Sequence, residues 1–160
     1  MSKPTPPFTL VNIRDRRTYW IGGQRQALIV GAAETGGRYA LSHVVITAES
    51  GAAEHIHGTE AEAFYLLTGR LRFRIAGRET LLEPGAFLHL EPGLPYSFDL
   101  VGADPAEVLV LYAPAGLERF IAEVGVADIP DAATRSLQDV SAMKLRARAY
   151  GVTYTARKTS

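Results

Sequence analysis

The chain has 160 residues, 47% of them apolar, and its 17 basic residues balance 17 acidic residues to a formal net charge of zero. That length suffices for one domain with a core and a pocket. Zero net charge argues against nucleic acid or an anionic membrane as a partner, because both attract a positive surplus. The chain has no cysteine, which excludes disulfides and thiolate-held metals and leaves imidazole and oxygen as metal ligands.

The start of the chain predicts no targeting segment. Residues 1–7 are polar and rich in proline, without the apolar stretch of a signal peptide. No apolar run approaches the roughly 20 residues that a membrane-spanning helix needs. We therefore expect a cytoplasmic protein that acts on a small-molecule substrate and binds neither membrane nor nucleic acid.

The first two thirds of the chain read as short strands separated by turn residues. In Leu71–Ile75 apolar and charged residues alternate strictly, which is typical of a strand with one buried face. The turn residues 68–70 predict a hairpin that joins this strand to the preceding one. About nine strands are expected, which favours an all-β sandwich or barrel. The expected strands are 18–21, 27–31, 38–47, 63–67, 71–75, 79–82, 86–90, 96–101 and 108–112.

The pattern changes to helical after residue 114. Apolar residues recur from Leu117 to Val124 with the spacing of one helix face, and Gly125 follows at the position of a C-cap. Residues 137–150 predict a second helix that ends at Gly151. The expected organisation is an N-terminal arm (1–15), a β-barrel (16–114), C-terminal helices (115–152) and a frayed polar tail (153–160).

Two of the four histidines carry the strongest chemical signal. His55 and His57 are two residues apart, so on a strand their side chains project from the same face. Glu62 follows a short loop and begins a new strand that we expect to lie beside the first. Two imidazoles and one carboxylate suit Fe(II) and related ions and leave positions open for substrate and O₂.

This segment resembles the first motif of the cupin superfamily, in which a His-x-His pair is followed by a glutamate and then a glycine. Here His55, His57, Glu62 and Gly69 match it in order. Residues 83–85 and 92–95 are similar to the second cupin motif, and the likeness covers residues 16–152. The best match is the group of small single-domain cupins similar to quercetin 2,3-dioxygenases. The resemblance implies a cupin double-stranded β-helix, or jelly-roll barrel, with a short helical appendage at the C-terminus.

One position departs from the family pattern. Where the second motif supplies a last metal-binding histidine, this chain has Tyr96. Three interpretations stay open: His55, His57 and Glu62 suffice as ligands, Tyr96 binds the ion as a phenolate, or the pocket works without metal.

Other residues are candidates for the substrate pocket. His89 shares strand parity with Phe87, which allows it to face the interior and either replace the missing ligand or bind substrate. His43 sits in a long apolar strand, where a structural role is the usual one and a pocket role is the alternative. The apolar candidates for the pocket lining are Phe64, Leu66, Phe73 and Phe98.

Three functions follow as hypotheses. The first is a metal-dependent dioxygenase for a small enolic, phenolic or polyketide-like molecule, with Glu62 as ligand or base and Fe, Mn, Ni, Cu or Zn as the ion. The second is a non-oxidative cyclase or isomerase that uses Glu62 as base and Tyr96 as proton donor. The third is a metal-free binding module. We also expect a homodimer that forms through the apolar strands at residues 19–20 and 27–30.

Overall fold

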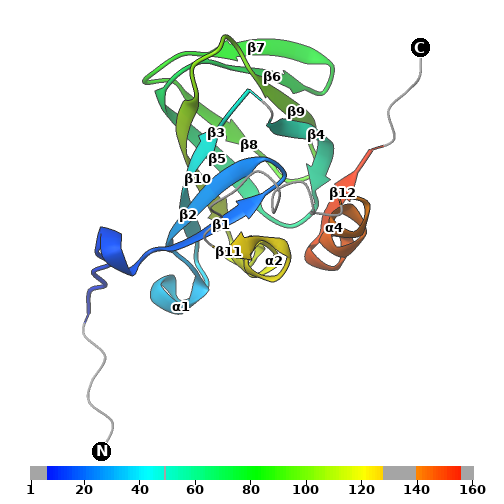
Figure 1. Ribbon diagram of the computed structural model, residues 1–160. Helices are drawn as coiled ribbons and strands as arrows, with labels where there is room; N and C mark the ends of the chain where they lie inside the picture. The colour runs from blue at the N-terminus through cyan, green and yellow to red at the C-terminus, as the bar shows by residue number, and fades with distance from the viewer. Residues whose placement is uncertain (1–6, 49, 128–139, 156–160) are drawn as a thin grey trace, which may run out of the picture.

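The structure is a computed structural model that describes residues 7–48, 50–127 and 140–155, and it shows two antiparallel β-sheets that form a barrel (Figure 1). The larger sheet consists, in spatial order, of β11 (Val126–Ala127), β1 (Arg17–Ile21), β2 (Gln24–Val30), β3 (Ala40–Ile46), β10 (Ala106–Ala113), β5 (Ala61–Thr68) and β8 (Phe87–Leu90). The smaller sheet consists of β12 (Val152–Tyr154), β4 (Gly51–His57), β9 (Pro95–Leu100), β6 (Leu71–Ile75) and β7 (Arg78–Leu82). The helical elements are η1 (Ile13–Asp15), α1 (Ala32–Thr35), α2 (Leu117–Val124), α4 (Val140–Ala147) and η2 (Arg148–Tyr150). The all-β cupin-type fold expected from the sequence is confirmed.

Strict alternation decides which side chains enter the barrel. Every second residue of β3 and β10 is buried, so the inner faces of these strands carry mostly small and branched apolar side chains, together with Ser42 and Tyr112. From the smaller sheet, Phe73 contributes a fully buried ring that lies 5.1 Å from the ring of Phe64 and 5.2 Å from the ring of Phe98, measured between centroids. This aromatic cluster joins the two sheets and forms the floor on which the site is built.

The hairpin predicted at residues 68–70 is wrong. β5 pairs with β10 and β8, whereas β6 pairs with β7 and β9, so this turn carries the chain from one sheet to the other. Gly69 has a φ of 77°, and a Cβ atom there would lie 2.6 Å from the Cα of Ala106. A glycine is therefore required by the close approach of the two chain segments as well as by the backbone angle.

The first predicted helix is confirmed, since α2 runs from Leu117 to Val124. Gly125 does follow it, but with an extended φ of −71° rather than the left-handed angle usual after a helix. A glycine is required here for a steric reason, because a Cβ atom at Gly125 would lie 2.5 Å from the carbonyl oxygen of Ile121. The second predicted helix appears as α4 followed by η2, and it ends at Gly151 with a φ of 78°. The expected start of this helix, 137–139, lies outside the described residues.

The C-terminal segment belongs to the barrel. β12 pairs with β4, with Val152 opposite His57 and Tyr154 opposite His55. The frayed tail expected from residue 153 is therefore wrong for the described part, because residues 153 and 154 continue a sheet. Figure 1 shows α2 in yellow and α4 in orange beside β12 in red, and α4 contacts both α2 and β12. These elements cover one end of the barrel.

Part of the surface expected to form a homodimer is covered within the chain. β11 pairs with β1 at Tyr19 and Trp20, and Ile21, Ala27 and Leu28 are buried. A homodimer stays a prediction, and size-exclusion chromatography with light scattering tests it. Among the described residues, no helix combines the length and the apolar character that crossing a membrane requires.

Candidate metal centre and active site

His55, His57 and Glu62 converge inside the barrel. One potential ligand atom from each lies within 4.8 Å of the others, and all three side chains are buried. The expectation that Glu62 lies on a strand beside the histidines is wrong, because β4 and β5 belong to different sheets. The three meet because the inner faces of the two sheets confront each other just after the chain crosses between them.

Hydrogen bonds set the ring orientation of both histidines. Nδ1 of His55 donates to the carbonyl oxygen of Ala53 at 2.8 Å, and Nδ1 of His57 donates to Oε1 of Glu60 at 2.6 Å. In the neutral imidazole a donating Nδ1 leaves Nε2 with a free lone pair. Both Nε2 atoms are therefore prepared to bind an ion, in the manner of histidines held by an outer carboxylate or carbonyl.

Glu60 is a site residue that the sequence interpretation missed. It is buried, it bonds to His57, and its second oxygen accepts a hydrogen bond from the hydroxyl of Thr59. Its pKa is lowered, because these hydrogen bonds and the charge of His57 outweigh the burial that would raise it. An acidic residue three positions after the second histidine, inside the loop of the motif, was the signal available in the sequence.

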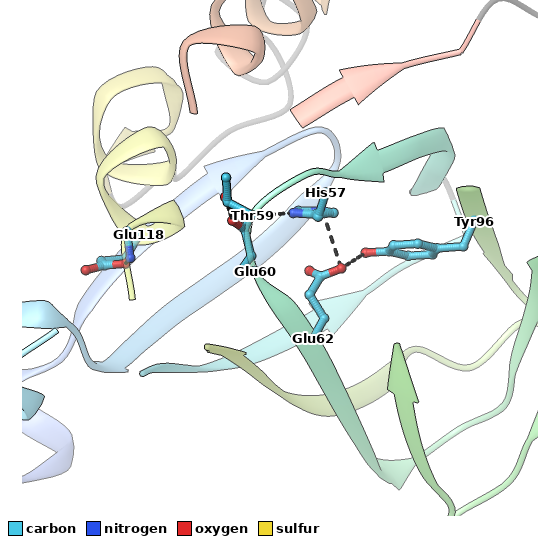
Figure 2. Close-up of polar contacts among 7 residues, drawn as sticks. His57, Thr59, Glu60, Glu62, Tyr96 and Glu118 are labelled. Carbon is cyan, nitrogen blue, oxygen red and sulfur yellow. Dashed lines mark hydrogen bonds and ion pairs between the residues drawn. The ribbon is translucent and has the colours of Figure 1, made fainter. Parts of the chain in front are cut away.

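Tyr96 points into the same cluster. It lies opposite His55 in the β4–β9 register, and its hydroxyl donates to Oε2 of Glu62. Nε2 of His57 lies 3.4 Å from that same oxygen. Figure 2 shows the Glu62 carboxylate between the His57 imidazole and the Tyr96 ring. The resemblance places a fourth metal ligand at position 96. In this chain that position holds Tyr96, whose hydroxyl contacts the third candidate ligand, Glu62.

Burial dominates the acid–base properties of the cluster. It lowers the pKa of His55 to about 4, with a further contribution from the charge of His57. It raises the pKa of Glu62 to about 7 despite the opposing effects of His57 and Tyr96, and raises that of Tyr96 well above its usual value. For His57, burial is outweighed by Glu60 and Glu62, so its pKa is raised. Near neutral pH, Glu62 is a carboxyl group able to accept or release a proton.

The donor set fits a divalent first-row metal ion. Two neutral imidazoles and one carboxylate are ligands of intermediate hardness, which suits Fe, Mn, Ni, Cu or Zn. Ala53 and Glu60 hold the two imidazoles from behind through their Nδ1 atoms, and the hydroxyl of Tyr96 bonds to Glu62 from within the cluster.

The cluster opens into a cavity of about 420 Å³. Phe64, Phe73 and Phe98 line it, as expected from the sequence. Tyr112 and Tyr154 line it as well and were not singled out by the sequence interpretation. The volume falls in the range of sites for small molecules.

Three expected pocket residues lie elsewhere. Leu66 is fully buried but packs in the core, outside the cavity lining. His43 projects from the outer face of β3, since Ser42 and Val44 take the inward positions, and its Nε2 bonds to Glu107 at 2.9 Å. The side chain of His89 is 47% exposed and bonds to Glu91. Strand parity was read with the wrong phase at His89, because Leu88 and Leu90 are the residues that pack inward.

The comparisons with known proteins agree with this fold. A family profile described as the Cupin domain matches residues 42–112. No curated protein matches the chain. A predicted oxalate decarboxylase from Thermotoga maritima has a TM-score of 0.61 and 17% identity, with 66% of this chain and 99% of that chain covered.

Two further solved structures are similar. KdgF from Halomonas sp. has a TM-score of 0.60 at 12% identity, with 69% of this chain and 99% of that chain covered. The nucleoside dehydratase Pac13, whose variants with uridine are from Streptomyces, has a TM-score of 0.58 at 12% identity, with 69% and 86% covered. At these identities the likeness shows the shared fold. Together with the two facing sheets and the profile match, it shows that residues 42–112 carry a cupin domain and that this chain has the cupin fold.

Proposed function

We propose that this chain is a metal-dependent cupin enzyme that performs acid–base chemistry, an isomerisation or an elimination, on a small molecule with an acidic C–H beside a carbonyl. The observation that carries the proposal is the buried hydrogen bond from Tyr96 to Glu62, with His57 3.4 Å from the same carboxylate oxygen. A base and a proton donor held against each other are the pair that such reactions require.

The residues divide the work as follows. His55 and His57 would hold the ion, with Glu62 as a third ligand or, when released, as the base. A bound ion would supply Lewis acidity toward a substrate oxygen. Glu62 takes the proton from carbon on its Oε2 atom, while the hydroxyl of Tyr96 gives its own proton to the developing oxyanion or leaving hydroxyl. In an elimination, Tyr96 then recovers a proton from Glu62, which returns both groups to their starting states. In an isomerisation, Glu62 delivers its proton to another carbon of the enol while Tyr96 takes back the proton on the enol oxygen.

The surroundings support this assignment. The raised pKa of Glu62, about 7, lies near the operating pH, where a general base is most effective. The aromatic floor formed by Phe64, Phe73 and Phe98 keeps bulk water from the reacting atoms. One of the similar structures is a nucleoside dehydratase, and loss of water is an elimination of the class proposed here.

Dioxygenation is the second candidate. The two-His-one-carboxylate arrangement favours it, because that donor set leaves positions open for substrate and O₂. The contact of Tyr96 with Glu62 favours the acid–base reaction, because a fixed proton donor has no evident task in the insertion of oxygen.

An oxygen-resolved assay separates the two candidates. Metal-loaded protein is incubated in D₂O with a panel of β-hydroxy oxo acids and catechols, while NMR follows deuterium entry and water loss and an electrode follows oxygen. We expect turnover without oxygen uptake, abolished by a chelator and reduced about 100-fold or more in Tyr96→Phe. The control is Tyr65→Phe, which alters an exposed tyrosine on the strand of Glu62. Oxygen consumption in proportion to product, or full activity in Tyr96→Phe, would overturn the proposal.

A further inference from the structure

The cavity contains two polar side chains that the proposed chemistry does not use. Lys144 enters it from α4, and Gln26 enters it from β2. The two elements approach the cavity from different sides of the fold, one from the helical cover and one from the larger sheet. Among the described residues, Lys144 has no carboxylate partner and Oε1 of Gln26 has no hydrogen-bond donor, so a ligand in the cavity could supply both.

Lys144 is a cation without a carboxylate partner in the described part of the chain. It is half-buried, and its Nζ atom lies 5.1 Å from the ring centroid of Tyr154. The ring of Tyr154 in turn stacks on the imidazole of His55, with 5.4 Å between centroids and 26° between planes. The ammonium group is thus one aromatic ring away from the metal centre. Among the described lining residues, it is the only lysine or arginine.

Gln26 presents an unsatisfied acceptor to the cavity. The residue is only 9% exposed, and its Oε1 atom has no hydrogen-bond partner. Its neighbour on the same face, Gln24, differs, because Nε2 of Gln24 donates to the carbonyl oxygen of Gly51 at 3.2 Å. A buried carbonyl oxygen without a donor is costly to the fold, so such groups point to a missing partner. A ligand hydroxyl would supply the donor.

We propose that the cavity takes a small hydroxylated carboxylic acid, whose carboxylate pairs with Lys144 and whose hydroxyl donates to Oε1 of Gln26. This rests on the proposed function, because it names the substrate class of the same cavity. One ammonium in the cavity lining suits a singly charged carboxylate better than a phosphate, which is usually held by several cations or a cradle of backbone N–H groups. The aromatic lining accommodates the carbon skeleton between the two ends.

Binding measurements test the proposal without requiring turnover. The probes form two matched series: mandelate, phenylacetate and mandelamide, and 3-(4-hydroxyphenyl)propanoate, 3-phenylpropanoate and 3-(4-hydroxyphenyl)propanamide. Each series compares a hydroxy acid with its analogue lacking the hydroxyl and with its uncharged amide. Affinities are measured by calorimetry on the full-length protein, both metal-loaded and after chelator treatment. In at least one series the hydroxy acid should bind about tenfold tighter than either analogue.

Variants assign the two contacts. Lys144→Gln should weaken the hydroxy acid about tenfold and leave the amide unchanged, while Lys144→Arg should retain most of the affinity. The control is Arg148→Gln, which removes an exposed cation just beyond α4 and outside the cavity lining. Gln26→Leu should abolish the preference for the hydroxylated acid without weakening the binding of its hydroxyl-free analogue. Its thermal unfolding midpoint should not fall, since a buried unpaired oxygen is removed.

The outcomes are distinct from those of the catalytic assay. If no acid binds, if amides bind as well as acids, or if Lys144→Gln binds the acids like wild type, the proposal is wrong. If Gln26→Leu keeps the preference for the hydroxyl, its half of the proposal is wrong. If binding depends on Lys144 and Gln26 while Tyr96→Phe retains full turnover, the substrate class stands and the proposed acid–base function fails.

Discussion

Glu60 decides which nitrogen of His57 is available to an ion. Its carboxylate accepts a hydrogen bond from Nδ1 of His57, with 2.6 Å between the nitrogen and Oε1. The lone pair on Nε2 therefore faces Glu62 and the cavity. A carboxylate behind a metal-binding histidine also increases the basicity of the ring. The orientation and basicity of His57 therefore depend on its hydrogen bond with Glu60, and a substitution at Glu60 tests this role.

Replacing Glu60 with glutamine keeps the shape of the side chain and removes its charge. We expect Glu60→Gln to weaken the binding of Mn²⁺ or Zn²⁺ about tenfold or more, because the ligand nitrogen becomes less basic and less well oriented. Metal titration by calorimetry measures this. Glu91→Gln, on an exposed side chain that bonds to His89 outside the cavity, serves as the control and should bind the metals like wild type. Equal affinities in the two variants would contradict the assigned role.

Protons compete with the metal at Glu62. Because burial raises the pKa of this carboxyl group to about 7 in the metal-free protein, it is mostly protonated below pH 7 and must lose that proton when the ion binds. Affinity should therefore rise with pH up to about 7, by roughly tenfold per pH unit for each proton released. Titrations between pH 5.5 and 8.5 check this.

Tyr96→Phe provides the matched comparison for that profile. The hydrogen bond from Tyr96 lowers the pKa of Glu62, so its loss should move the rise in metal affinity to higher pH. An affinity that does not change between pH 6 and 7, or a profile that is identical in the variant, would contradict this account.

The direction of some side chains could be predicted from the sequence, whereas the direction of His89 could not. The spacing of His55, His57 and Glu62 indicated a shared site, because two-residue spacing on a strand determines direction. The phase of an isolated strand is harder to infer, and His89 was placed inward although it bonds to Glu91 at the surface. Its strand is short and apolar at both Phe87 and Leu88, so alternation alone offered no choice of face.

At the scale of the element, the turn at Gly69 is where the predicted strand pairing differs from the observed one, because β5 and β6 lie in different sheets. The strand boundaries on either side were predictable from alternation, because a half-buried strand must alternate. The pairing was not, since a turn signal is the same whether the next strand lies beside the last or crosses to the opposite sheet. The close approach of Gly69 to Ala106, 37 positions later in the chain, is set by the tertiary fold.

This turn supports a prediction about stability. Gly69→Ala should destabilise the protein by at least about 2 kcal/mol, because the methyl group meets backbone atoms as well as an unfavourable φ. The control is Gly77→Ala, where φ is 80° but nothing lies within 4 Å, so only the conformational cost of about 1 kcal/mol applies. Urea unfolding measures both. Equal losses would show that the crossing is not sterically tight.

At the scale of the whole molecule, a bound ion would tie the two sheets together, because β4 and β5 come from different sheets and both carry ligands. A metal that binds only the folded state stabilises it by about 2.7 kcal/mol at a concentration 100 times its Kd. For a chain of this length, that corresponds to a rise of roughly 5–10 °C in the unfolding midpoint.

Differential scanning fluorimetry with and without metal measures this rise. His57→Ala should abolish it, and a chelator should reverse it in the wild type. A rise that persists in His57→Ala would place the stabilising ion elsewhere in the molecule.

The pairing of β12 with β4 has a consequence for how the protein is made. The strand that carries both histidines is synthesised about 100 residues before the strand that completes its edge. During translation, the edge of β4 that pairs with β12 stays unpaired until β12 is synthesised. The helix α4, which carries Lys144, is synthesised shortly before β12. The part of the cavity wall that α4 and β12 provide is therefore the last to be added to the chain. The three candidate metal ligands are synthesised well before Lys144, the residue proposed to recognise the carboxylate of the substrate.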